Sequence, residues 1–233
     1  MKTLFFDSGP VISLTTSNLL DILEPLKRRF DGEFFITPAV KRELVERPLK
    51  IKRFEFEALQ VSKIIGEGIL TLTDVDVAQR SARLLKLANR CYQSKGKDLH
   101  IVHEAEVELL AAVCEFPEST MVIDERTMRL LLEDPEDLRK LLEQRLHTDV
   151  TLHKDALAQL QREVGTVRMI RSAELAVVAV SIGALQGLAP HGRYGEELLL
   201  DAVLWRLKSN GCGISAQEIE EVKELMRKHP RQG

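Results

Sequence analysis

The feature that most constrains the fold of this chain is a series of short apolar runs, each followed by residues at helical spacing. The runs are KTLFFD at 2–7, EFFIT at 33–37, ILTLT at 69–73 and STMVID at 119–124. Short apolar runs bounded by turn residues are typical of buried strands. Strands that alternate with helices predict an α/β fold, in which a parallel sheet has helices on both faces and right-handed crossovers.

Helices are expected between and after these strands. Ser8, Gly9 and Pro10 predict a turn after the first strand, and Ser17 is a suitable N-cap for a helix beyond it. Further helices are expected from Pro38, over 54–65, from Asp76 to Tyr92, over 102–114 and over 126–147, with a break near Pro135. The polar segment QSKGKD at 93–98 is expected to be a loop.

The pattern changes after residue 147. No strand is predicted there, and amphipathic helical stretches are expected at 153–163, 172–187, 195–209 and 215–228. We therefore predict two domains, 1–147 and an all-helical C-terminal module at 148–233, with the boundary at Thr148–Val150. The module is expected to pack on the first domain, to form a homodimer, or to bind a protein partner.

Composition and cysteine usage set the broad class. With 44% hydrophobic and 30% charged residues, the chain has the composition of a globular protein. Cys91, Cys114 and Cys212 are widely spaced and follow no secretory signal, which favours reduced thiols in a cytoplasmic protein. The most apolar stretch, 175–188, is shorter than the roughly 20 residues of a membrane span, so no membrane partner is expected.

Charge and aromatic content limit how the chain could bind nucleic acid. The formal net charge of -3 gives no general attraction to a polyanion, and aromatic residues make up only 5% of the chain, which leaves few base-stacking platforms. Local basic clusters at 27–29, 50–53 and 95–97 remain candidates for phosphate contacts.

Two acids end strands that are predicted to lie inside the sheet. Asp7 closes the first apolar run and Asp124 closes the fourth, so both are expected at the carboxyl edge of the sheet, where ligands of such sheets bind. Either acid alone could simply cap the helix that follows its strand. Together they favour a site.

Two further acids lie on helices next to these strands. Glu43 is about one turn into the helix from Pro38, where its side chain could lean back toward the strand ends. Glu104 opens the helix before the fourth strand, where the helix dipole favours a carboxylate. Glu106 lies about 200° around the helix from Glu104, so only one of the two is expected to face a site. Asp98 is a weaker rival, because its predicted loop setting suits a surface or capping role.

Several carboxylates in one pocket predict a metal site. They repel one another, and a hard divalent cation with oxygen ligands, Mg²⁺ or Mn²⁺, relieves that repulsion. The cation would activate a water for in-line attack on a phosphodiester and would stabilise charge on the leaving oxygen. The acids therefore predict metal-dependent hydrolysis that needs no catalytic histidine.

The same segments resemble a known family. FFDSGPVISL, ITPAVKREL, HEAEVELLA and VIDERTMRLL have the order and spacing of PIN-domain (PilT N-terminus-like) ribonucleases over about 147 residues. The resemblance implies a three-layer α/β/α sandwich that binds Mg²⁺ or Mn²⁺ and cuts single-stranded or structured RNA, as bacterial and archaeal toxin endonucleases do. It implies catalytic and metal-binding roles for Asp7, Glu43, Glu104 and Asp124, with Ser8 as a hydroxyl neighbour of Asp7.

Two departures from the family pattern leave points open. Many relatives have two acids or an Asn-Asp pair after the last strand, whereas this chain has Asp124 followed by Glu125, so either could face the metal and Asp124 is favoured. The chain is also much longer than the toxin members, which leaves a toxin or a housekeeping role open.

The function expected from the sequence is thus a metal-dependent endoribonuclease, a hydrolase that cleaves RNA phosphodiester bonds. The alternative is a PIN-fold protein that binds RNA or a protein partner without cleaving. A dehalogenase-type phosphatase is disfavoured because it needs a second Asp two residues after the first, and position 9 is Gly. No GxxxxGK[ST] or GxGxxG motif is present, which excludes the common nucleotide-binding loops.

Overall fold

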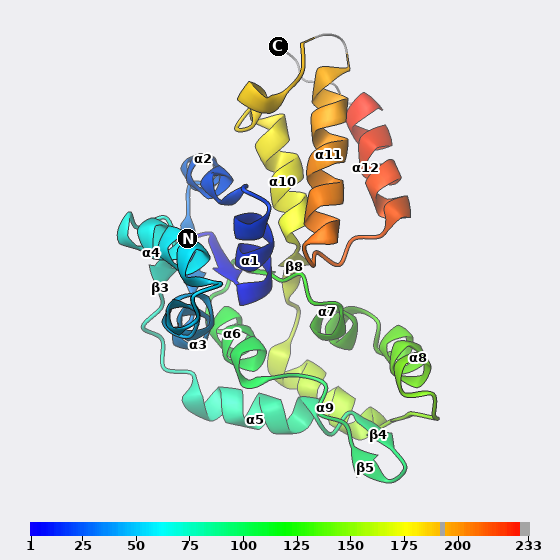
Figure 1. Ribbon diagram of the computed structural model, residues 1–233. Helices are drawn as coiled ribbons and strands as arrows, with labels where there is room; N and C mark the ends of the chain where they lie inside the picture. The colour runs from blue at the N-terminus through cyan, green and yellow to red at the C-terminus, as the bar shows by residue number, and fades with distance from the viewer. Residues whose placement is uncertain (192–193, 229–233) are drawn as a thin grey trace.

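The computed structural model describes residues 1–191 and 194–228 and contains a central five-stranded parallel sheet (Figure 1). The strands lie in the order β3-β2-β1-β6-β8, and every pairing between them is parallel. Their bounds are β1 Thr3–Phe6, β2 Glu33–Ile36, β3 Thr71–Leu72, β6 Ser119–Val122 and β8 Arg168–Ile170. The predicted α/β class with a central parallel sheet is confirmed.

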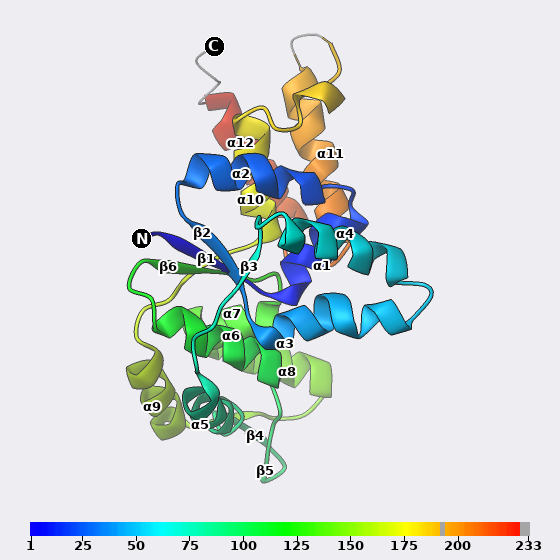
Figure 2. The same cartoon turned by 90° about the vertical axis from the view of Figure 1, so that its left-hand side faces the viewer.

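Helices cover both faces of this sheet, and Figure 2 shows the two groups above and below it. Alternate residues of β1 point to opposite faces, so Leu4 and Phe6 join one core while Phe5 joins the other. The first core is covered by α1 Ser8–Thr16, α2 Leu23–Phe30, α4 Glu55–Gly66, α10 Ser172–Ser181, α11 Gly195–Ser209 and α12 Ala216–Lys228. The second is covered by α5 Ala78–Ala88, α6 Glu104–Cys114, α7 Arg126–Glu133, α8 Pro135–Leu146 and α9 Lys154–Val164. The layering is compatible with an α/β/α sandwich.

The segment after β1 differs from the prediction. A turn was expected at residues 8–10 and a helix from Ser17, but α1 begins at Ser8 and Ser17 is its C-cap. Asp7 is the N-cap, and Pro10 fits in the first turn because its missing N–H would have no partner inside the helix there. The main chain then leaves the helix at Asn18, whose φ is 59°.

The predicted loop at 93–98 is instead a small hairpin. β4 Tyr92–Ser94 pairs antiparallel with β5 Lys97–Asp98, and β7 Thr151–Leu152 pairs with β4 on its other side. The turn residues Lys95 and Gly96 have φ values of 51° and 74°. Two positive φ values suit the tight two-residue turns of hairpins.

Residues after 147 are not all helical, which corrects the expectation of a purely helical module. β8 pairs parallel with β6 and adds the fifth strand to the central sheet. α9 lies with α5 and α6 in the second core, whereas α10, α11 and α12 belong to the first core together with α1 and α2. The sheet and both cores therefore extend across the predicted boundary at Thr148–Val150.

The first helix after β2 has an irregular end. α3 Pro38–Lys41 continues into a π-helical turn, η2 Arg42–Glu46, and then into a short 3-10 helix, η3 Pro48–Lys50. Such π turns are often found at functional sites. Two other 3-10 helices, η1 Leu20–Ile22 and η4 Gln186–Leu188, lie within connecting segments.

The cysteines and the helix lengths can be compared with the expectations directly. All three cysteines are free thiols; Cys91 and Cys212 are buried and Cys114 is half-buried. Within the described ranges, every helix is too short or too polar to cross a membrane.

Candidate functional site

The candidate site lies where the strand order of the sheet reverses. From β1 the chain proceeds outward through β2 and β3 on one side, and then adds β6 and β8 on the other. In open α/β sheets, ligands bind beyond the carboxyl ends of the strands at such a reversal. Asp7 and Asp124 follow the two adjacent strands β1 and β6, so both are at this edge, as the sequence predicts.

Asp7 is buried beyond the end of β1 and is the N-cap of α1. One of its carboxylate oxygens, Oδ2, accepts a hydrogen bond of 3.2 Å from the backbone N–H of Gly9. Burial raises the pKa of Asp7 to about 6; hydrogen bonds from the backbones of Gly9 and Ser8 oppose this rise, and the charges of Glu43 and Asp124 add to it. The Asp7 carboxylate is therefore near two other acids and is poorly compensated by cations.

Asp124 is also buried, but its carboxylate already has two partners. Oδ1 accepts a hydrogen bond of 2.8 Å from the backbone N–H of Ser172, and Oδ2 accepts one of 2.7 Å from the Ser172 hydroxyl. Ser172 is the first residue of α10, so Asp124 binds the start of a helix far along the chain. Asp7 thus caps the helix that follows its strand, whereas the helix after β6 is capped by Glu125 and Asp124 binds α10 instead.

Glu43 reaches the site from the π-helical turn η2. Its side chain is about 32% exposed, and its charge raises the pKa values of both Asp7 and Glu106. The nearest cation, Arg47, is 3.9 Å away with a 71% exposed side chain, a separation at which an ion pair contributes little. Glu43 is therefore placed with the other acids, as the sequence predicts.

Helix α6 presents Glu106 to the site and leaves Glu104 exposed. Burial raises the pKa of Glu106 to about 7; a hydrogen bond from the backbone of His103 opposes this rise, and the charges of Glu125, Asp7 and Glu43 add to it. The Glu106 carboxylate also closes a capping box, in which it accepts a 2.8 Å hydrogen bond from the His103 N–H. Glu104 lies in solvent two residues earlier.

Glu104, the acid that the sequence favours on this helix, is exposed, and Glu106 is half-buried instead. The two acids are equivalent in residue type, and the neighbouring positions Ala105 and Val107 are both buried in the structure. One available signal was the capping-box spacing from His103 to Glu106, which fixes the position of the second acid at the start of the helix.

The secondary candidates Ser8 and Glu125 also lie at this edge. Ser8 is the first residue of α1, and its backbone N–H donates to Asp7. Glu125 is the N-cap of α7 and accepts a 2.8 Å hydrogen bond from the Met128 N–H. Asp124 and Glu125 therefore have different neighbours. Asp124 binds Ser172, whereas the charge of Glu125 raises the pKa of Glu106. Asp98, the rival acid, is exposed on β5.

A hollow of about 320 Å³ opens beside the acids. Glu106 and Glu125 both line it, and His100, His103 and Arg145 lie on its other walls. Asp7 and Asp124 are only 5% and 3% exposed, whereas Glu106 and Glu125 line this hollow and Glu43 is about 32% exposed, so the half-buried acids are the part of the group that solvent reaches. We use "acid cluster" below for Asp7, Glu43, Glu106, Asp124 and Glu125.

The donor chemistry of the acid cluster fits a hard divalent cation. Its side chains offer carboxylate oxygens, which are the ligands that Mg²⁺ and Mn²⁺ prefer. The buried Asp7 is disfavoured as an anion without a counter-charge, and a cation would relieve that cost. Within the described residues, however, no group of three or more His, Cys, Asp or Glu side chains is close enough to hold an ion. Side chains of the half-buried acids would have to turn inward for several of them to coordinate one ion.

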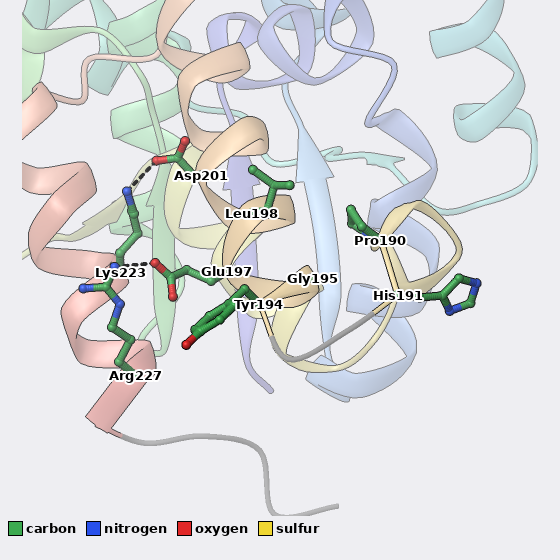
Figure 3. A pocket seen from close by; sticks show the side chains of 9 residues that line it. All are labelled: Pro190, His191, Tyr194, Gly195, Glu197, Leu198, Asp201, Lys223 and Arg227. Atoms are coloured by element: carbon green, nitrogen blue, oxygen red, sulfur yellow. Dashed lines mark hydrogen bonds and ion pairs between the residues drawn. The ribbon is translucent and has the colours of Figure 1, made fainter.

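A second hollow, of about 620 Å³, lies between α11 and α12 and is shown in Figure 3. It contains two ion pairs, one between Lys223 and Asp201 at 2.7 Å and one between Arg227 and Glu197. These charges neutralise each other across the two helices. The hollow therefore presents no cluster of unpaired acids comparable to the one at the sheet edge.

Comparison with known proteins does not assign the chain. No family model, curated protein or solved structure matches this sequence.

Proposed function

We propose that the chain is a metal-dependent endoribonuclease whose acid cluster binds Mg²⁺ or Mn²⁺ and cleaves RNA phosphodiester bonds. The observation behind this proposal is that acids from three separate elements lie near one another at the carboxyl edge of the sheet: the charge of Glu43 raises the pKa of Asp7, and the charges of Asp7 and Glu43 raise that of Glu106. Three acids at one place repel one another and destabilise the fold, so a structural role alone does not account for them. Perturbed carboxyl groups in a cleft are typical of functional sites.

Asp7, Glu43 and Glu106 are the residues that would hold the metal. When bound there, a divalent cation supplies a water activated for attack and neutralises charge on the leaving oxygen. Asp7 is held in place by the backbone of α1, whereas Glu106 accepts a hydrogen bond from the His103 N–H and would turn inward to reach the ion. Asp124 fixes the start of α10 and thereby positions the wall of the site, and Glu125 lines the approach from solvent.

The test compares Glu106→Gln with Glu104→Gln, a matched pair on one helix. Gln keeps the acceptor oxygen of the capping box, so Glu106→Gln removes the charge and leaves the helix start intact. Labelled RNAs are incubated with Mg²⁺ or Mn²⁺, and with EDTA as the metal-free control. Wild type and Glu104→Gln should cleave at similar rates, whereas Glu106→Gln and Asp7→Asn should lose at least the roughly 10–100-fold that is lost when a residue supporting a metal ligand changes. Equal activity of all four proteins would reject the proposed site.

A non-cleaving protein that binds RNA or a protein partner is the second candidate. Two observations favour it: the described acids do not converge on one point, and each oxygen of the Asp124 carboxylate already accepts a hydrogen bond from Ser172. RNA that is bound but never cleaved, with either metal, would establish this candidate over the nuclease.

A further inference from the structure

A third hollow, of about 660 Å³, has four cations in its lining. Arg126, Arg129, Arg171 and Lys208 line it, and Glu218 is the one acid in the lining. These residues come from α7, from the start of α10, from the end of α11 and from α12. The chain as a whole has a net charge of -3, so a wall with four cations and one carboxylate is a local reversal of charge. We call it the basic hollow.

Two of the cations are tied into the fold. Arg171 is 8% exposed and donates to Glu174 at 2.6 Å, to Glu218 at 2.7 Å and to the backbone carbonyl of Gly213 at 3.0 Å. Lys208 donates to the Ile214 carbonyl at 2.6 Å. These bonds fix the turn between α11 and α12 and hold the floor of the basic hollow rigid.

The other two cations lie on one face of α7. Arg126 and Arg129 are three positions apart, a spacing that puts both side chains on the same side of a helix. Arg129 is 3.5 Å from Glu133 in an ion pair of the i,i+4 type, which is weak at a surface. Arg126 is exposed and forms no hydrogen bond or ion pair within the part of the chain that the structure describes, although its charge lowers the pKa of the exposed Asp137 on α8. This pair is therefore available to an anion.

The basic hollow adjoins the acid cluster. Glu125 is the N-cap of the helix that bears both arginines, and Asp124 precedes it. Gly213, in the lining, lies so close to Asp124 that a Cβ at position 213 would be 2.7 Å from the Asp124 carbonyl oxygen. In Figure 1 the turn after α11 lies above α7. A strand bound at the acid cluster would therefore have this wall beside it, across the start of α7.

We propose that the basic hollow binds a backbone phosphate of the RNA strand, with Arg126 and Arg129 as the phosphate-binding residues. This inference rests on the proposed nuclease function, and it gives the C-terminal helices a role in substrate binding. Arginine suits the task because its planar guanidinium donates two parallel hydrogen bonds to phosphate. The volume is within the range of about 300–1,000 Å³ that is typical of ligand sites.

The experiment measures RNA binding by the full chain without cleavage. A 3′-labelled RNA with a 5′-hydroxyl end, which offers backbone phosphates alone, is titrated in EDTA and followed by fluorescence anisotropy. The variant is Arg126→Gln/Arg129→Gln. The control, Arg90→Gln/Arg162→Gln, removes the same charge from exposed positions elsewhere. A third variant, Arg126→Lys/Arg129→Lys, keeps the charge and changes the fork geometry.

We expect the double Gln variant to weaken binding about 10-fold and to reduce the slope of log K against log salt by about 1 to 2, because up to two phosphate contacts are lost. The control should stay within about twofold, and the Lys variant should retain most of the salt slope. Equal losses in the variant and the control would overturn the proposal. If the Gln variant binds normally while Asp7→Asn abolishes cleavage, the nuclease function stands and the basic hollow is excluded; if no RNA is bound or cut, both fail.

Discussion

Ser172 donates both its hydroxyl and its backbone N–H to the carboxylate of Asp124, at 2.7 Å and 2.8 Å. The two residues are 48 positions apart, and both are buried. The pair joins the end of β6 to the start of α10, so it holds a helix of the C-terminal segment against the carboxyl edge of the sheet. It also directs one acid of the cluster toward the protein interior.

Ser172→Ala removes the hydroxyl donor and leaves the backbone N–H in place. We expect the free energy of unfolding to fall by about 1.5–3 kcal/mol, the range for hydrogen bonds to charged groups. Urea unfolding at neutral pH measures this. Ser209→Ala is the control: that hydroxyl is exposed and donates to the Trp205 carbonyl within its own helix, so a change below about 0.5 kcal/mol is expected. Similar losses in both variants would show that the Asp124 contact adds no special stability.

Asp7→Asn should stabilise the metal-free protein at alkaline pH. The pKa of Asp7 is raised from 3.8 to about 6, so the folded state binds the proton more tightly than the unfolded state. Below about pH 4 the acid is protonated in both states and the cost of its charge is absent. As the pH rises through 6, the free-energy cost of the buried charge becomes fully present. A pKa raised from 3.8 to about 6 corresponds to a cost of about 3 kcal/mol. Asn keeps an acceptor for the Gly9 N–H and is a good N-cap.

Urea unfolding of wild type and Asp7→Asn in EDTA between pH 4 and 8 checks this expectation. The stability difference should grow between about pH 4 and 6 and then level off. The exposed Asp21→Asn is the control and should remain within about 0.5 kcal/mol of wild type. Addition of Mn²⁺ should stabilise wild type and leave Asp7→Asn unchanged if the acid cluster binds the ion. A difference that does not vary with pH would contradict the electrostatic account.

Gly213→Ala tests the close approach of the turn after α11 to β6. A Cβ there would lie 2.7 Å from the Asp124 carbonyl oxygen, a backbone atom that cannot simply rotate away. We expect a loss of about 1–3 kcal/mol in unfolding free energy, as overpacking at a rigid contact causes. Gly66→Ala is the control, because nothing lies within 4 Å of its Cβ position, and it should gain about 0.4–1 kcal/mol. If both substitutions were neutral, the turn would be free to shift.

The sequence predicted the central strands well because they are buried on both faces. In β1 all four residues are buried, and such strands form continuous apolar runs. β8 escaped prediction because it has only three residues, RMI, and is exposed or half-buried along its length at the edge of the sheet. α1 was missed because Pro10 after Ser8-Gly9 suggests a turn, whereas the Asp7 cap makes the same residues a helix start.

The candidate site was predictable in part for a similar reason. Asp7 and Asp124 follow adjacent strands, and strand ends define the edge of a sheet regardless of how the helices pack. The choice between Glu104 and Glu106 depends on the rotation of α6 against the sheet, which tertiary packing sets. The Ser172 contact and the basic hollow unite residues far apart in the chain, so no local pattern could predict them.

Glu218→Gln should weaken the attachment of α12 and change the response of the protein to acid. Burial would raise the pKa of Glu218, but hydrogen bonds from the Ser215 backbone, Arg171 and the Ser215 hydroxyl outweigh it and hold the pKa at about 2. The folded state therefore releases this proton more easily than the unfolded state, in which this carboxyl has its ordinary pKa of 4.5. The stabilisation is present above about pH 4.5 and is lost as the pH falls toward about 2.

Since the Glu218 side chain is 39% exposed, solvent screens the pair with Arg171, and we expect a loss of about 1 kcal/mol at pH 7 in the Gln variant. The loss should shrink below about pH 4.5, because wild type itself is then increasingly protonated. Urea unfolding at a series of pH values, with hydrogen exchange of the α12 amides, measures both effects. Gln keeps the capping-box bond from the Ser215 N–H, so the start of the helix stays intact. A change in hydrogen exchange would therefore reflect the loss of the ion pair with Arg171. The exposed Glu221→Gln, which lies on the same helix, should alter stability by no more than about 0.5 kcal/mol and leave the exchange unchanged. A pH-independent loss in Glu218→Gln would mean that packing, and not the ion pair, holds α12 to α10.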